Sequence, residues 1–121
     1  MKPPTRGRST KVLDGVTAGA SILYSDPIDD LLFFNTVTVV VTNAHATQTL
    51  DFLVQAKINR EDVDAVWITI LAQNTLSADS SDTVTVADAA DLNAAWDAIR
   101  IGYVQSDGSN KGTLNAWINR K

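Results

Sequence analysis

Side chains able to carry out chemistry are scarce in this sequence of 121 residues. It contains no cysteine, one histidine, His45, and one glutamate, Glu61. His45 lies in the polar stretch at residues 42–48, and a catalytic or metal-binding imidazole needs a partner that the sequence does not reveal. We therefore predict a surface histidine, no catalytic residue and a protein that is not an enzyme.

Aspartates gather at four places, where carboxylates could hold calcium or, in pairs, hydrolyse glycosidic bonds. The clusters lie at residues 26–30 and 61–64, at Asp79 with Asp82, and at Asp88 with Asp91. None has the spacing of a calcium-binding loop with its central glycine and final glutamate, and aspartate is common in turns and helix caps. We expect solvated turns and predict no cofactor and no metal, with calcium as the alternative.

The elements that position these residues are predicted to be strands, because valine, threonine and isoleucine recur with period two. The clearest strand covers residues 51–58, where Phe52, Val54 and Ala56 share one face. Residues 65–71 are apolar on both faces, so we expect that strand at the centre of a sheet or packed against a second surface. Further strands are predicted at residues 11–16, 20–24, 35–41, 83–86, 99–104 and 114–119.

The last two strands, joined by the turn-rich residues 106–112, predict a β-hairpin. Residues 88–98 carry a capping Asp88 and apolar residues at helical spacing, which predicts at most a short helix near 88–96. Seven or eight short strands with frequent turns indicate an all-β protein. We predict an antiparallel β-sandwich resembling a jelly roll, formed by residues 12–121 as a single domain.

Charge is distributed unevenly along the chain. Residues 1–11 hold four basic side chains and no acid, whereas residues 12–110 hold all fourteen acids against three basic side chains. A basic segment with so little apolar surface predicts a flexible N-terminal arm over residues 1–11. An acidic body repels phosphate, so we expect no specific nucleic acid partner. The apolar runs are too short for a membrane span, and no apolar stretch of a secretory signal follows the basic residues, which predicts a cytoplasmic start.

Several apolar residues fall on the expected outer faces of their strands, namely Trp117, Val40, Leu53 and Leu71. Such side chains fit either a subunit contact or, for Trp117, a platform for a sugar ring. Of these two, we favour the subunit contact. Trp67 and Trp96 are predicted to belong to the core.

Three stretches form a further pattern: SILYSD at residues 21–26, the strand at 37–41, and the end of the chain, with AWDAIRIGYV at 95–104, DG at 107–108 and GTLNAWI at 112–118. Over most of residues 20–121 this pattern resembles the small β-sandwich virion proteins of tailed bacteriophages. Capsid decoration proteins, also called cement proteins, are the closest kind. A penultimate strand with an arginine between apolar residues, a short loop and a last strand are common in them.

The resemblance implies a structural virion protein, made in the host cytoplasm and located on the capsid surface. It would assemble as a homotrimer over the joints between subunits of the major capsid protein and stabilise the shell. Arg6, Arg8 and Lys11 would then be arm contacts, and Trp117 with Val40, Leu53 and Leu71 would be subunit contacts. A carbohydrate-binding β-sandwich module and a small tail, baseplate or receptor-binding component are the alternatives.

Overall fold

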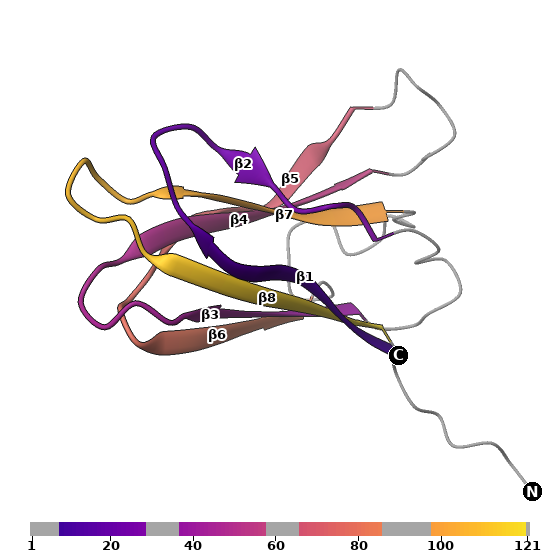
Figure 1. Ribbon diagram of the computed structural model, residues 1–121. Helices are drawn as coiled ribbons and strands as arrows, with labels where there is room; N and C mark the ends of the chain where they lie inside the picture. The colour runs from indigo at the N-terminus through magenta and orange to yellow at the C-terminus, as the bar shows by residue number, and fades with distance from the viewer. Residues whose placement is uncertain (1–7, 29–36, 58–65, 86–97, 121) are drawn as a thin grey trace, which may run out of the picture.

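The computed structural model describes residues 8–28, 37–57, 66–85 and 98–120. These residues form eight strands in two layers (Figure 1). The strands are β1 (Arg8–Thr17), β2 (Leu23–Tyr24), β3 (Val37–Asn43), β4 (Leu50–Lys57), β5 (Ile68–Leu76), β6 (Ser80–Thr85), β7 (Ala98–Gln105) and β8 (Thr113–Arg120).

Each layer is a four-stranded antiparallel sheet. The first sheet has the order β1-β8-β3-β6, and the second has the order β2-β7-β4-β5. Consecutive strands alternate between the two sheets, with one exception: β4 and β5 pair directly in the second sheet. From β5 to β6 the chain returns to the first sheet. Eight strands arranged in this way form a jelly roll, so the predicted sandwich is confirmed.

The core lies between the inner faces of the two sheets. In β3 the residues alternate strictly between buried and half-buried, and the buried ones are Val37, Val39, Val41 and Asn43. Burying each such aliphatic side chain contributes about 1.5–3 kcal/mol relative to exposure. The largest fully buried apolar side chains are Phe52, Leu50, Ile99, Ile101, Leu114, Ile118, Val39, Val41 and Val54.

The predicted hairpin between the last two strands is wrong. β7 pairs with β2 and β4 in the second sheet, whereas β8 pairs with β1 and β3 in the first. Both strands bury a complete apolar face, and these faces meet across the core rather than lying side by side in one sheet. The loop at residues 106–112 is long enough to cross the roughly 10 Å between packed sheets.

The predicted central position of residues 65–71 is also wrong, because β5 is an edge strand of the second sheet. Its pairing with β4 shifts register twice, between Phe52 and Val54 and between Val54 and Gln55. These irregularities let the neighbouring residues Ile70 and Leu71 both contact the core, which a regular strand does not allow.

The predicted arm is too long at its C-terminal end. Arg8 pairs with Arg120 and Lys11 with Trp117 in β1, so residues 8–11 belong to the sheet. Residues 1–7 and the helix predicted near 88–96 lie outside the described residues.

Asn43 joins three loops at one end of the sandwich. It is 1% exposed. Its Nδ2 donates to the carbonyl oxygens of Gln48 (2.7 Å) and Leu76 (3.3 Å), and its Oδ1 accepts the backbone N–H groups of His45 and Thr113, each at 3.1 Å. A Cβ on Gly112 would approach both terminal atoms of Asn43 to 2.8 Å, so a glycine is needed beside this amide.

His45 also stabilises this end of the sandwich through hydrogen bonds. Its Nδ1 accepts the backbone N–H groups of Thr47 (3.1 Å) and Gln48 (3.0 Å). The ring therefore caps the loop between β3 and β4, and it is half-buried rather than fully exposed at the surface.

Candidate interaction surfaces

Three of the residues predicted to make contacts lie side by side on the outer face of the first sheet. Trp117 is opposite Lys11 on one side and Val40 on the other. The Lys11 Nζ lies 5.1 Å from the centroid of the Trp117 ring and 2.9 Å from Asp14 Oδ1. We call Lys11, Trp117 and Val40 the Trp117 row. The period-two pattern predicted the outward positions of Trp117 and Val40, whereas Lys11 was expected in the arm and lies in β1 instead.

The other predicted contact residues do not join this row. Leu53 is on the outer face of the second sheet and is only 5% exposed. Leu71 packs against the core, so its expected outward position is wrong. Arg8 belongs to β1 and pairs with Arg120 of β8, and Arg6 lies outside the described residues.

The outer face of the second sheet holds a cluster that the sequence did not predict. The guanidinium carbon of Arg100 lies 3.8 Å from the ring centroid of Tyr24 and 4.3 Å from that of Trp67. Arg100 Nε and Nη2 both donate to Gln55 Oε1, at 2.9 and 2.7 Å. Lys57 Nζ lies 5.1 Å from the Trp67 ring. We call Tyr24, Gln55, Lys57, Trp67 and Arg100 the Arg100 stack.

Strand order brings the members of the Arg100 stack together. β7 lies between β2 and β4, and Arg100 of β7 is opposite Gln55 of β4. Gly102 is two residues further along the same face of β7, and it is opposite Tyr24 of β2. A Cβ on Gly102 would approach Leu53 Cγ and Tyr24 Cε1 to 2.9 Å each. The glycine therefore allows these two side chains to lie close against β7, with the Tyr24 ring beside Arg100.

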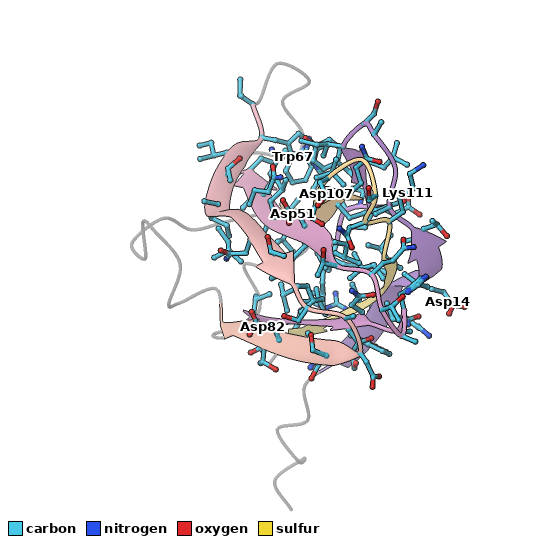
Figure 2. The ribbon with its side chains drawn as sticks, turned by 90° about the vertical axis from the view of Figure 1, so that its left-hand side faces the viewer. Asp14, Asp51, Trp67, Asp82, Asp107 and Lys111 are labelled. Carbon is cyan, nitrogen blue, oxygen red and sulfur yellow. The ribbon has the colours of Figure 1, made fainter. Side chains whose placement is uncertain are left out.

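The predicted core position of Trp67 is wrong. It directly precedes β5, is half-buried and contacts two cations. Figure 2 shows Trp67 in the upper layer, away from Asp82 in the lower layer. Trp96 lies outside the described residues. The available signal was the outward position of Arg100 between Ile99 and Ile101, since an arginine in the middle of a strand favours an aromatic neighbour.

The charge of the stack is not neutralised within the described part of the chain. There, neither Arg100 nor Lys57 has a carboxylate oxygen within 4.0 Å, and the hydrogen bonds of Arg100 go to a neutral amide. Desolvation by burial lowers the pKa of Arg100, and the charge interaction with Tyr24 opposes that shift. Asp51, further along β4, is occupied by Gln73 Nε2 and Thr75 Oγ1, each at 2.7 Å.

Exposed apolar side chains lie along the two edges of the second sheet. Across the described ranges, the exposed large hydrophobic residues are Tyr24, which belongs to the stack, and Ile22, Leu23, Val66 and Ile68, which lie on or next to the edge strands β2 and β5. Val66 is the most exposed, at 75%. The second sheet thus carries a cationic centre on its outer face and apolar margins at its two edges.

In the parts of the chain that the structure covers, no three acidic or histidine side chains lie close enough together to bind a metal ion, so no calcium site is found there. Residues 61–64, Asp88 and Asp91 are outside these parts. The covered ranges also contain no helix that is long and apolar enough to cross a membrane.

The strand order defines the class of this protein as an eight-stranded jelly roll. Its sequence matches no protein-family model and no curated protein. Its fold is similar to that of a chain in the structure of infectious bursal disease virus, Gx strain, with a TM-score of 0.50 and 12% sequence identity. The similarity covers 95% of this chain and 31% of that chain.

Proposed function

We propose that this chain is a structural protein of a virus particle, and within that class a head decoration protein of a tailed bacteriophage. In this role it binds the outer surface of the major capsid protein at subunit junctions, as a homotrimer, and stabilises the shell without catalysing a reaction.

The fold supports the coarser part of this proposal. Almost the whole chain follows the jelly roll of a chain from a virus structure, and jelly rolls recur in viral capsid domains. Because the same fold also occurs in lectins and enzymes, the fold alone does not distinguish between these functions, and the surface residues must be considered. The observation that carries the proposal is that both outer faces of the sandwich hold ordered cation–aromatic contacts, in the Trp117 row and in the Arg100 stack. A protein held between several neighbours needs more than one such face.

The aromatic rings give less support to the carbohydrate-binding alternative. Sugar recognition by stacking uses an open ring face. Each of Tyr24, Trp67 and Trp117 has a cation over its ring, at 3.8 to 5.1 Å. These rings already have a stacking partner.

The proposal is tested on particles of the virus that encodes the chain. Mass spectrometry of purified particles is expected to detect the chain, and gold-labelled antibodies are expected to bind to heads. Particles lacking it are expected to release their DNA at a lower temperature. Labelling confined to tails, or an unchanged release temperature, would contradict the decoration role. Light scattering tests the trimer, whose mass is expected near three times 13.0 kDa.

A further inference from the structure

We propose that the Arg100 stack and its apolar margins form the surface that docks onto the shell, and that the occupant is an acidic patch of a different protein, with a carboxylate bound to Arg100. This inference rests on the proposed function and assigns its docking surface to the second sheet.

Exposure favours the second sheet over the first. The exposed large hydrophobic residues of the described ranges lie at the two edges of the second sheet, at β2 and at the start of β5. On the first sheet, Trp117 and Val40 are half-buried. Apolar surface around a few fixed polar groups is typical of a protein contact, with the fixed groups at its centre.

Charge indicates what the partner must supply. Arg100 and Lys57 are two cations without a carboxylate partner in the described part of a chain whose net charge is −4. A two-fold contact between copies would place this surface against itself and bring the cations together. Like charges that meet at an interface cost several kcal/mol. An acidic surface on another protein complements the stack, and a second copy in a two-fold contact does not.

The guanidinium of Arg100 is prepared for a carboxylate. Two of its five N–H donors bind Gln55 Oε1, and the described residues accept no further hydrogen bond from Arg100. The free donors match the two oxygens of a carboxylate. Tyr24 and Trp67 already fix the plane of the group, so binding loses less side-chain entropy than an unrestrained arginine would.

The aliphatic margins favour a protein over a nucleic acid. Surfaces that bind nucleic acids are polar and strongly positive, and they stack bases on open aromatic faces. Here the exposed Ile22, Leu23, Val66 and Ile68 lie at the edges of the sheet that carries the cations, and the rings of the stack already carry cations. Binding to single-stranded DNA in place of shells would overturn the proposal.

The first test measures binding of the full chain to shells of the encoding virus that were prepared without it. Arg100→Glu is expected to weaken binding by at least about 30-fold, since it reverses the charge at the centre of the proposed contact. Val66→Glu, at the most exposed apolar position, is expected to weaken it by at least about fivefold. Lys111→Glu is the matched control, because it reverses an exposed cation in the loop before β8 (Figure 2), and it is expected to change affinity by less than about twofold.

The outcomes separate the two proposals. If the unaltered chain does not bind shells, the proposed function fails. If it binds and both Arg100→Glu and Val66→Glu behave like Lys111→Glu, the docking surface is wrong while the function stands. Thermal unfolding of each variant shows whether it is folded. Val66→Glu keeps the test decisive if Arg100→Glu does not fold, because Val66 precedes β5 and contributes little to the core.

The second test identifies the occupant directly. A water-soluble carbodiimide activates a carboxylate, and an adjacent lysine amine then forms an amide bond with it, while the carbodiimide leaves as its urea with the oxygen removed from the acid. On shells carrying the chain, mass spectrometry is expected to find Lys57 joined to an aspartate or glutamate of a shell protein. A link from Lys57 to a second copy of this chain, or no link at Lys57, would overturn the proposal.

Discussion

Replacing Asn43 is expected to destabilise the whole sandwich, although this residue lies far from either candidate surface. Asn43→Ala removes four hydrogen bonds and leaves the backbone N–H groups of His45 and Thr113 without their acceptor. An unsatisfied buried donor costs about 1–3 kcal/mol. Because water can reach part of this end of the molecule, we take about 1.5 kcal/mol for each donor, which gives a loss of about 3 kcal/mol in the free energy of unfolding.

This loss is large for a domain whose total stability is on the order of 5–15 kcal/mol. For a chain of this length, 1 kcal/mol corresponds to about 4 °C in Tm, so Asn43→Ala is expected to lower Tm by about 12 °C. Denaturant unfolding followed by tryptophan fluorescence measures the free energy, and calorimetry measures Tm. The matched control is Asn74→Ala, since Asn74 is exposed and its side chain makes no hydrogen bond to the described residues, and its effect is expected to stay within about 0.5 kcal/mol.

Asn43→Asp separates hydrogen bonding from packing, because it keeps the shape and the accepting oxygen. The new oxygen would face the carbonyl oxygens of Gln48 and Leu76. Such a buried carboxyl has a raised pKa in the folded state, so its deficit is largest above that pKa and shrinks as the pH falls and an O–H donor forms. If Asn43→Ala costs no more than Asn74→Ala, or if Asn43→Asp is as stable as the unaltered chain at neutral pH, the amide does not hold this end together.

The remaining predictions concern single positions. Gly102→Ala is expected to cost about 1–3 kcal/mol by calorimetry, because its Cβ would lie 2.9 Å from two side-chain carbons. Gly15→Ala is expected to cost about 1 kcal/mol through backbone strain alone, since φ is +61° with open space around the Cβ, and Gly15→Asn is expected to cost less. Hydrogen bonds lower the pKa of Asp107, first from the backbone N–H of Ser109 and then from a side-chain amide. The stability they give is present above the unfolded value and lost as the pH falls through the lower folded value, so Asp107→Asn is expected to reduce the acid sensitivity of Tm. Asp82→Val is expected to promote association, visible by light scattering, because the Asp82 carboxylate occupies the backbone N–H of Thr83 (2.8 Å) on the edge strand β6.

For the regular strands, alternation in the sequence was enough to predict the strand and the face that each residue takes. The strand predicted at residues 51–58 is found at Leu50–Lys57, and the inward residues of that strand are as expected. Alternation carries no information about the partner of a strand. The alternation in β7 and β8 is compatible both with a hairpin in one sheet and with an arch that connects the two sheets. The arch forms because the apolar faces of the two strands pack against each other across the core.

The wrong outward position predicted for Leu71 has a physical cause. The register shifts against β4 place Leu71 opposite the buried Val54 and turn it towards the core. No residue in this segment signals those shifts, because neither glycine nor proline occurs between residues 66 and 76. A period-two pattern is reliable only while the ladder is regular, and an irregular edge strand reverses the inferred faces beyond each shift.

The Arg100 stack shows why a binding surface of this kind escapes sequence reasoning. Its members come from β2, β4, β7 and the residue before β5, and they meet only because β7 lies between β2 and β4. The inner faces of these same strands supply the core, so the fold depends on residues such as Ile99 and Ile101, while Arg100 between them faces outward. Outward residues can therefore change without rebuilding the core. The cations of the stack form no ion pair among the described residues, so their charge adds no such pair to the stability of the fold. For that reason we attribute the charge to binding of the proposed acidic partner.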